Sequence, residues 1–513
     1  MLSRWRLAQG SARLLIVLTA ALLAVRLYAA HRVGFGDSEA LYACYALHPQ
    51  PAYLDHPGLV GVFARAIATH GAPTPLAAHV ATAMISSLVP WLVVVAARGA
   101  GASWRSAFVA ACAVAVVPEI AIGLFAMTPD LLLAIAWLAA LGLGCAGLRA
   151  TPASARASAL LIGAGLAAGI ATAAKVSGVT LVVALAATYA TRSARAHART
   201  AWPWLGLLAG ALVVAPIALF EARTGWSMSR HRLVDTQGDA GPSLRNVAAV
   251  VGGQLAYLSP LVAIAAAIVL RDLVRSRGRI GDEPDDAAGT LLLFALALPL
   301  VVLVPLCLWS RVAEPHWIAP ALLALPIHYA RRTTSTPLVS RRFGIASLAT
   351  SLAIVAAAHA WILVPSLVRF TPASFDASRD ITSELYGWPE AIAAVRRIAV
   401  EARAPGSDRG DLVVVGPHWV ICAQLEAGLA TTPSAPPVGC ATPIRDDFDR
   451  WYPRATWQRA ETIVLVTDGR FAVDAATLAP KHVESRQERV TIWRAGRVAR
   501  IFVVRVLERR AAT

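Results

Sequence analysis

The chain has 513 residues, of which 57% are hydrophobic and 15% charged, and it carries a formal net charge of +16. Soluble globular proteins average about 25% charged residues, so this composition excludes an ordinary soluble protein. Residues 1–365 carry +13 and residues 366–513 only +3, so the basic excess lies among apolar blocks, which argues against a nucleic-acid partner and for contact with membrane lipids.

Apolar blocks long enough to cross a bilayer, about 20 residues each, recur along residues 1–365. They are expected to be helices, because lipid offers no hydrogen-bond partner for the backbone. The two blocks beside Lys175 are alternatively one broken helix, and the first block is alternatively a cleaved signal peptide. We predict eleven spans, at residues 14–30, 76–97, 106–124, 129–148, 158–173, 178–191, 202–221, 247–270, 288–309, 315–330 and 343–365.

Arginine residues predict the orientation in the membrane. Cytoplasmic loops carry the excess of Lys and Arg, so the connections rich in Arg are predicted to be cytoplasmic. The N-terminus is then cytoplasmic, and residues 31–75, residues 222–246 and the tail after residue 365 lie outside. Eighteen arginines lie in the six cytoplasmic connections, within residues 1–13, 98–105, 149–156, 192–199, 271–279 and 331–342.

The tail, residues 366–513, predicts a soluble α/β domain that follows a transmembrane domain of residues 1–365. Short β-branched runs at residues 411–416, 462–467 and 500–505 are typical of strands. Residues 389–402 have helical spacing after Pro389, a suitable first-turn residue. The tail contains Cys422 and Cys440, which could form a disulfide in an oxidising compartment.

Polar residues at the predicted outer ends of the spans are the candidate functional residues, because a charge at membrane depth costs about 2.5–3.5 kcal/mol on insertion scales. Carboxylates there could act as a general base, and a lysine or arginine could hold a phosphate. Lys175 stands out as one of two lysines in the chain. The candidates, in chain order, are Asp37, Glu39, Tyr42, Asp55, His56, Asp130, Lys175, Arg223, Arg230, His231, Arg232, Glu314 and His316.

Each candidate also has a structural interpretation. Asp130 after Thr128-Pro129 could cap its helix, and Asp55 could cap a short interfacial helix. Lys175 could extend to the lipid headgroups, and the arginines of residues 222–246 could contact headgroups in the same way. Their shared predicted side of the membrane favours function over these alternatives.

A set of motifs in a fixed order resembles the GT-C membrane glycosyltransferases. The resemblance is to the branch with the aminoarabinose lipid A transferases and the lipopolysaccharide galacturonosyl transferases, and more distantly to the protein O-mannosyltransferases. It covers nearly the whole chain. The residues that carry it are Glu39-Ala40-Leu41-Tyr42, Tyr53-Leu54-Asp55-His56-Pro57, Thr128-Pro129-Asp130, Lys175-Val176-Ser177, Gly252-Gly253-Gln254-Leu255 with Ser259-Pro260, His316-Trp317-Ile318-Ala319-Pro320, Leu385-Tyr386-Gly387-Trp388 and Asp447-Phe448-Asp449-Arg450-Trp451.

The sequence departs from the family pattern at three positions. The first acidic position of the family aligns with Ser38, and Asp37 stands one residue earlier. Gly58 replaces the second proline of the Asp-His-Pro-Pro motif, and His316 stands where asparagine is usual.

The resemblance implies an inverting glycosyltransferase of the inner membrane. Its donor would be a polyprenyl-phosphate sugar, and its acceptor an envelope lipid, glycan or protein on the outer face. Asp37, Glu39 and Asp130 would be catalytic, Asp37 or Glu39 as the base. The remaining candidates would bind substrate, with Lys175 and the loop arginines on the leaving phosphate. A cofactor is not certain, and Asp37 and Asp130 would be the residues to hold a divalent cation.

Two other classes of function remain as alternatives. The first is a polytopic transporter or flippase of a lipid-linked substrate, whose site would lie near the bilayer midplane between inverted repeats. The chain shows no such repeat, and its candidates gather at span ends. The second is a membrane scaffold with an outer binding domain, which would not need acidic residues at span ends.

Overall fold

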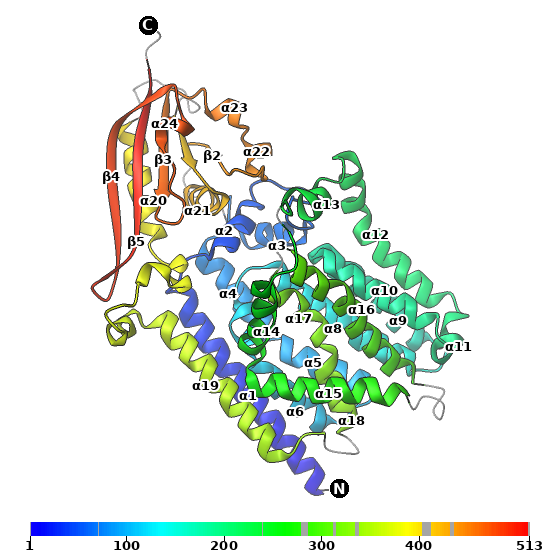
Figure 1. The fold of residues 1–513 in the computed structure, drawn as a ribbon. Coiled ribbons are helices and arrows are strands. Elements are labelled where there is room, and N and C mark those ends of the chain that lie inside the picture. Colours follow the sequence, from blue (N-terminus) through cyan, green and yellow to red (C-terminus); the bar gives the residue numbers. More distant parts are fainter. Residues whose placement is uncertain are drawn as a thin grey trace. The chain divides into compact units, whose positions relative to one another are not determined.

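The computed structural model describes residues 2–69, 71–238, 240–278, 286–310, 314–333, 338–402, 412–430 and 435–510. The predicted cytoplasmic Arg279 and the first residue of the predicted strand, Asp411, lie outside these ranges. The chain divides into two compact units (Figure 1). The first comprises residues up to Arg26, Asp55–Leu59 and Thr82–Ala358, and the second Leu27–Leu54, Val60–Ala81 and residues from His359 onward.

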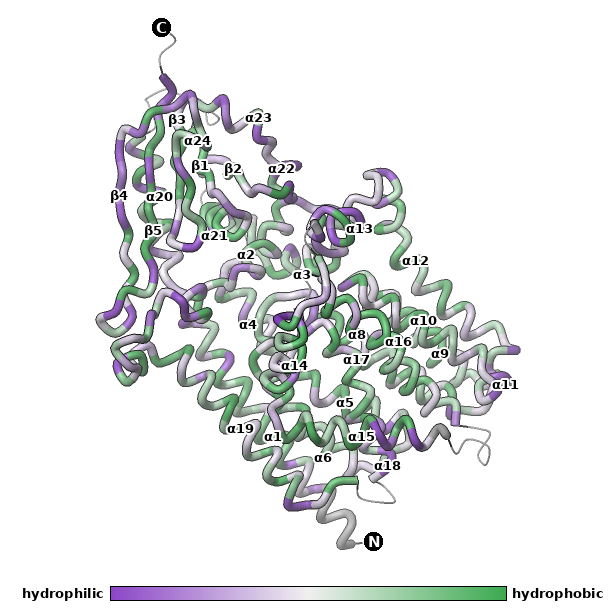
Figure 2. The backbone as a smooth tube through the Cα atoms, in the orientation of Figure 1, coloured by the Kyte–Doolittle hydropathy of each residue, from purple (hydrophilic) through white to green (hydrophobic). Residues whose placement is uncertain are grey.

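Helices make up the first unit, and the long helices at Pro129–Leu148, Ala155–Ala174 and Ala287–Trp309 are mostly apolar (Figure 2). The helices of residues 2–125 are α1 (Leu2–Ala30), α2 (Asp37–Cys44), α3 (Leu59–Ile67), α4 (Pro75–Ser86), α5 (Val89–Gly99), α6 (Trp104–Ala115), α7 (Pro118–Ala121) and η1 (Gly123–Phe125). Of these, α2 and most of α3 and α4 belong to the second unit.

The helices of the central region are α8 (Pro129–Leu148), α9 (Ala155–Ala174), η2 (Val176–Gly178), α10 (Val179–Tyr189), η3 (Arg192–Ala194), α11 (Arg195–Ala198), α12 (Trp202–Arg223), α13 (Ser227–Arg230) and η4 (His231–Asp235). Those that follow are α14 (Leu244–Leu258), α15 (Pro260–Gly278), α16 (Ala287–Trp309), η5 (Pro315–Ile318), α17 (Ala319–Leu322), α18 (Ala324–Arg332) and α19 (Arg341–Leu363).

Seven helices of the described residues are long and apolar enough to cross a membrane, and three further bent pairs raise the number to ten. The protein is therefore a multi-pass membrane protein. Ten of the eleven predicted blocks correspond to these spans or pairs. The block at 315–330 instead forms the short η5, α17 and α18, and Pro315 and Pro320 lie in the first turns of η5 and α17.

The predicted span at 247–270 is a bent pair of helices. Helices α14 and α15 meet at an angle of 102° at Ser259, whose φ is 68°. A positive φ is uncommon for a residue other than glycine, and the following Pro260 cannot donate a backbone hydrogen bond. The Oγ atom of Ser259 lies 2.6 Å from that of Ser351 on α19. This hydrogen bond satisfies the buried hydroxyl group at the bend.

Helices α9 and α12 are in backbone contact. A Cβ atom added at Gly165 or Gly169 of α9 would overlap the backbone of Gly206 or Gly210 of α12. Small residues four apart allow membrane helices to approach this closely. The contacts advance in the same direction along both helices, so α9 and α12 are parallel. The residues that follow α9 and α12, including Lys175, therefore emerge at the same end of this pair.

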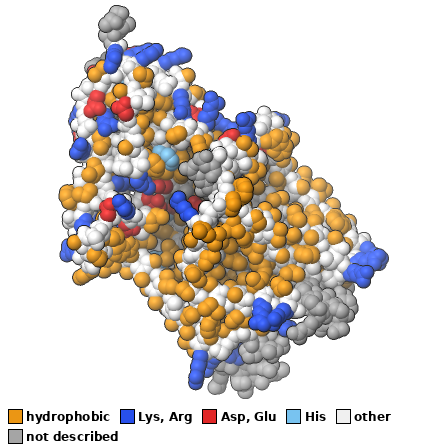
Figure 3. All heavy atoms as spheres, in the orientation of Figure 1, with side chains coloured by type: hydrophobic (Ala, Val, Ile, Leu, Met, Phe, Trp, Pro, Cys, Tyr) orange, Lys and Arg blue, Asp and Glu red, His pale blue; other side chains and the backbone are white. Residues whose placement is uncertain are grey.

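Hydrophobic side chains cover the visible face of the helical region continuously, while Lys and Arg gather around α11 and α18 (Figure 3). Helix α11 and the last two residues of α18, Arg331 and Arg332, belong to the connections that the sequence predicts to be cytoplasmic. A wide apolar surface without a protein partner is the normal outer surface of a protein in lipid.

The second unit contains a five-stranded mixed sheet of order β2-β1-β3-β5-β4. The inner strands β1 and β3 are almost wholly buried, as expected for parallel neighbours in a covered sheet. The strands are β1 (Leu412–Gly416), β2 (Val438–Cys440), β3 (Thr462–Asp468), β4 (His482–Arg494) and β5 (Arg497–Arg509), and the helices of this region are η6 (Pro365–Phe370), η7 (Ala377–Arg379), η8 (Ile381–Leu385), α20 (Trp388–Glu401), α21 (Trp419–Leu429), α22 (Phe448–Trp451), α23 (Arg454–Trp457) and α24 (Ala475–Leu478).

The three predicted strands and the predicted helix are present as β1, β3, β5 and α20. A disulfide joins Cys422 of α21 to Cys440 of β2, with Cα atoms 5.8 Å apart, which confirms the expected pairing. The other four cysteines, Cys44, Cys112, Cys145 and Cys307, are buried and free.

Candidate active site

An ion pair between Lys175 and Asp130 is the centre of a polar cluster in the first unit. Lys175 follows α9 with extended backbone, and Asp130 is the second residue of α8. The Lys175 Nζ donates hydrogen bonds to Asp130 Oδ1 and Oδ2 at 2.8 and 3.0 Å. The lysine side chain is almost fully buried, so it is not extended to the headgroups as the structural alternative required.

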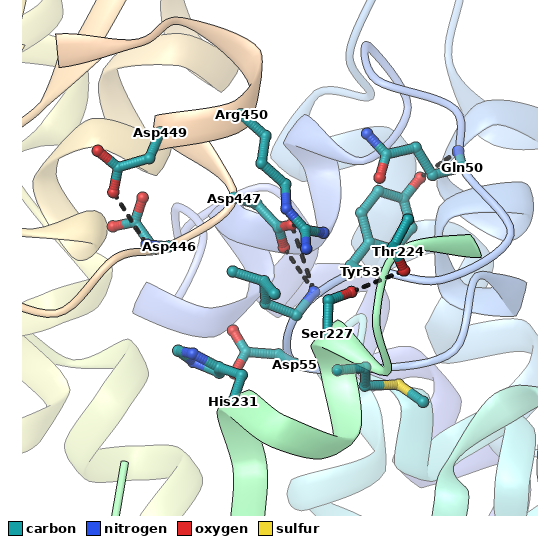
Figure 4. A network of polar contacts seen from close by, with 12 residues as sticks. Gln50, Tyr53, Asp55, Thr224, Ser227, His231, Asp446, Asp447, Asp449 and Arg450 are labelled. Carbon is teal, nitrogen blue, oxygen red and sulfur yellow. Dashed lines mark hydrogen bonds and ion pairs between the residues drawn. The ribbon is translucent and has the colours of Figure 1, made fainter. Parts of the chain in front are cut away.

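Asp55 and Arg232 form a second pair in the same unit. The Arg232 Nη2 lies 3.1 Å from Asp55 Oδ1, and its Nε donates to the Asp55 carbonyl at 3.2 Å. The His231 Nε2 lies 3.8 Å from the same carboxylate oxygen, and Figure 4 shows the two side chains. Arg232 is therefore held by the loop of Asp55 rather than free in solvent.

Trp317 connects the two pairs. Its ring centroid lies 5.4 Å from Lys175 Nζ and 5.7 Å from the Arg232 guanidinium carbon, within cation–π range of both. In the sequence, Trp317 appears only as part of the motif that begins at His316. The structure instead makes it a platform that holds two cations near each other.

His56 and His316 complete this cluster. His316 Nδ1 lies 3.2 Å from Glu314 Oε2, and its Nε2 lies 3.7 Å from Asp130 Oδ2. Burial lowers the pKa of His56 well below its usual value, and the charges of Arg232, Lys175 and His316 lower it further. His56 is therefore a neutral imidazole among cations, which can donate one hydrogen bond without adding charge.

Glu221, near the end of α12, positions the segment that carries Arg232. It is buried, and its carboxylate accepts hydrogen bonds from the backbone N–H groups of Met228 and Ser229 at 3.1–3.2 Å. A carboxylate at the first turn of α13 satisfies its otherwise unpaired N–H groups. No sequence motif indicated this role, although a lone glutamate at the end of an apolar block was a usable signal.

Two of the predicted catalytic carboxylates, Asp37 and Glu39, lie on α2 in the second unit. Glu39 is buried: its Oε2 accepts from the N–H of Gly36 at 2.9 Å, and its Oε1 lies 3.0 Å from His79 Nε2. These contacts hold the first turn of α2 in place. Glu39 thus has structural contacts on both oxygens.

Asp37 differs from Glu39 in its surroundings. Its side chain is 16% exposed, against 6% for Glu39. Its partner is Arg470, whose Nη1 lies 2.9 Å from Asp37 Oδ2. Arg470 belongs to the segment after β3 and was not indicated by any motif. Tyr42, on the same helix as Asp37, is buried and packs edge-on against Tyr45.

Asp447 holds the backbone just before the Asp55-His56 motif. Its buried carboxylate accepts the N–H of Leu54 at 3.0 Å for one oxygen and 3.3 Å for the other. The neighbouring Tyr53 stacks on Tyr45 at 3.5 Å, and Trp451 lies edge-on to both rings (Figure 4 shows Tyr53 and Asp447). The motif of residues 447–451 therefore holds Tyr53 and Leu54 within the second unit.

The structure brings seven of the predicted residues into the polar cluster of the first unit, and it places Arg223 exposed at the end of α12. Arg230 pairs with Asp235 at an exposed position. The seven are Asp55, His56, Asp130, Lys175, Arg232, Glu314 and His316, with His231 at the margin of the same cluster.

The described residues contain no group of three or more His, Cys, Asp or Glu side chains that could hold a metal ion. The suggested metal ligands, Asp37 and Asp130, each face a cationic side chain at hydrogen-bond distance instead. This donor set does not fit a divalent cation, and the proposed transfer mechanism does not require one.

Residues 55–220 match the family model described as dolichyl-phosphate-mannose-protein mannosyltransferase. The matched segment includes Asp55, Asp130 and Lys175 of the polar cluster, and it precedes Arg232. No curated protein matches the chain.

The fold is similar to that of ArnT from Cupriavidus metallidurans. The apo crystal structure of ArnT is 17% identical with a TM-score of 0.58, and the structure bound to undecaprenyl phosphate is 16% identical with a TM-score of 0.55. Each match covers 95% of this chain and 97% of ArnT. An oligosaccharyltransferase from Archaeoglobus fulgidus, tethered with an acceptor peptide, is 13% identical over 96% of this chain and 74% of that one, with a TM-score of 0.50.

A family match that contains Asp55, Asp130 and Lys175 of the polar cluster thus coincides with a fold shared over nearly the whole length. The chain is therefore similar to the dolichyl-phosphate-mannose-protein mannosyltransferase family over residues 55–220 and has the fold of the membrane protein ArnT over nearly its whole length.

Proposed function

We propose that the protein transfers a sugar from a polyprenyl-phosphate donor to a hydroxyl group of an envelope lipid, glycan or protein on the outer face of the inner membrane, with inversion. The observation that carries this proposal is the buried cluster around Lys175, Arg232 and Trp317. Support for the donor class comes from the undecaprenyl phosphate bound to ArnT and from the dolichyl-phosphate-mannose named by the family model.

Lys175 and Arg232 suit the phosphate of such a donor. When the bond between the anomeric carbon and the phosphate oxygen breaks, its electron pair leaves with the polyprenyl phosphate. The negative charge on that phosphate therefore grows in the transition state, where preorganised cations stabilise it most. Both carboxylate oxygens of Asp130 accept from the Lys175 Nζ, so its ammonium group is oriented before substrate arrives.

Asp37 is the group that we assign as the base. The acceptor oxygen forms the new bond to the anomeric carbon, and its proton passes to the Asp37 carboxylate. Glu39 is less suited, because both of its oxygens are engaged in a buried site. Attack from the side opposite the leaving phosphate inverts the anomeric configuration.

Mass spectrometry of envelope lipids and glycans from a deletion strain tests this function. The strain is expected to lack one sugar substituent, which the parent gene restores and an Asp130→Asn variant does not. An unchanged set of sugars, together with a lipid-linked sugar that accumulates on one side of the membrane, would support the transporter alternative.

The outer location of the tail is a prediction of its own. Arg placement predicts it, and the Cys422–Cys440 disulfide is consistent with an oxidising compartment. A reporter enzyme that is active only in the periplasm should therefore be active when fused to the C-terminus. The same reporter fused after Arg199, in a predicted cytoplasmic connection, should be inactive. The reverse pattern would put the candidate residues on the cytoplasmic face and refute the proposed side.

A further inference from the structure

A rigid turn follows strand β3. The buried carboxylate of Asp468 accepts the backbone N–H groups of Arg470 and Phe471, both at 3.0 Å. The Arg500 side chain donates to Asp468 at 2.9 and 2.6 Å and lies over the rings of Trp388 and Phe502. These contacts fix the backbone from which Arg470 projects.

Arg470 extends from this turn to Asp37. Its Nη1 lies 2.9 Å from Asp37 Oδ2 and its Nη2 3.5 Å from Oδ1, while its Nε lies 3.4 Å from Asp468 Oδ2. The next residue, Phe471, stacks on His418 with ring centroids 3.9 Å apart. The guanidinium group is thus anchored to its own turn and directed at one carboxylate.

We propose that Arg470 is a positioning residue for Asp37, an inference that rests on the proposed function. Through Arg470, the β-sheet domain controls the orientation of Asp37, the base of the transfer reaction. Arg470 contacts Oδ2 closely and Oδ1 only at 3.5 Å. An ionised carboxylate can accept about four hydrogen bonds, so Oδ1 remains available to an acceptor hydroxyl. Without Arg470 the Asp37 side chain would be free to change rotamer.

Glu384 gives this arrangement a pH-dependent partner. A Cβ atom added at Gly36 would lie 3.3 Å from Glu384 Oε1 and 3.4 Å from Glu39 Oε2, so these carboxylates meet beside the first turn of α2. Burial, and then the charge of Asp37, raise the pKa of Glu384 to about 7, while Arg470 opposes the increase.

The charged groups that act on Glu384 are Asp37, Arg470 and Glu39. Below pH 7 a protonated Glu384 donates a hydrogen bond to Asp37 and occupies a lone pair that the acceptor hydroxyl needs. Above pH 7 Glu384 ionises and this competition ends. Activity should therefore rise as the pH increases through about 7. Removal of Arg470 would raise the pKa of Glu384 further and move this rise to higher pH.

The test measures kcat, the KM for donor and acceptor, and the pH profile of the full-length protein in lipid vesicles. Arg470→Gln should lower kcat by about 10²-fold, as expected for a misplaced reacting group, and leave the donor KM unchanged. Arg470→Lys should recover part of kcat, because an ammonium group supplies the charge but not the two-pronged contact. The control is Arg486→Gln. Arg486 lies on the exposed strand β4 and pairs with Glu401 at the end of α20, so this variant should behave like the parent.

Glu384→Gln provides a second test if Arg470→Gln fails to fold. It cannot ionise, so the rise of activity near pH 7 should disappear. A parent-like kcat and pH profile in Arg470→Gln, or a retained rise in Glu384→Gln, would refute the positioning role. If Asp37→Asn is inactive while Arg470→Gln matches the parent, only this inference fails. If Asp37→Asn is active, the proposed base itself is wrong.

Discussion

Asp37→Asn is expected to lower the rate of sugar transfer by about 10²–10⁴-fold, the usual cost of losing a general base. Asparagine retains the size and the hydrogen-bonding oxygen of aspartate but cannot take a proton from the acceptor. Because Asp37 is partly exposed at the start of α2, its replacement should leave thermal unfolding close to that of the parent. Single-turnover transfer with saturating donor would measure the chemical step directly.

A structural carboxylate supplies the matched control. Asp474 caps α24, where its Oδ2 accepts the N–H of Thr477 at 3.0 Å. Asp474→Asn should cost at most about 1 kcal/mol of stability and leave turnover intact. Glu39→Gln should instead destabilise α2, because the N–H of Gly36 and the ring of His79 both depend on that side chain. Parent-like transfer by Asp37→Asn would remove Asp37 from the mechanism.

Lys175→Ala is expected to weaken use of the donor by about 10²–10³-fold in kcat/KM, the cost of removing one preorganised group that stabilises developing charge. The effect should be greatest at limiting donor concentration. Measurements of the donor KM and of the release of polyprenyl phosphate in vesicles would test this expectation.

This substitution also leaves Asp130 without its cation in a buried site, which can cost about 3–5 kcal/mol. The double variant Lys175→Ala with Asp130→Asn removes that unpaired charge. It should recover stability but not donor use. Lys481→Ala, at the other lysine of the chain, which is exposed, is the control. Recovery of donor use in the double variant would reduce Lys175 to a structural ion-pair partner.

The spans were predictable because lipid imposes a simple rule: a continuous apolar block must be a helix. The rule does not say where a helix bends. At the bend, Ser259 has a positive φ, and its hydroxyl pairs with that of Ser351, 92 residues away, a contact that no local pattern reveals. The block at 315–330 was long and apolar, but its prolines divide it into short helices.

The sheet was predictable only where burial made its strands apolar. Strands β1 and β3 are continuous β-branched runs. Strand β4 lies at the edge of the sheet and is rich in charge, which is how edge strands avoid pairing with other chains, and the same charges hid it from the sequence analysis. Strand β2 has three residues, too few for a pattern.

Among the site residues, Lys175 was identifiable by its rarity, and Asp130 by its place at a span end. Their ion pair was not, since 45 residues separate them. Arg470 lies 433 residues from Asp37, in a domain where arginine is common, so no sequence signal distinguished it. The role of Trp317 was not predictable, because its contacts with Lys175 and Arg232 join residues that are far apart in the sequence.

The contact between α9 and α12 has a consequence for behaviour in the cold. Hydrophobic burial in water weakens as temperature falls, but glycine-to-glycine contact inside lipid depends on dispersion and on close approach of the backbones. Cooling therefore has little influence on this pair. Lys175 follows one of its helices, and the segment that carries Arg232 follows the other. The spacing of these two cations is thus set by an interaction that should persist at temperatures where water-dependent packing loosens.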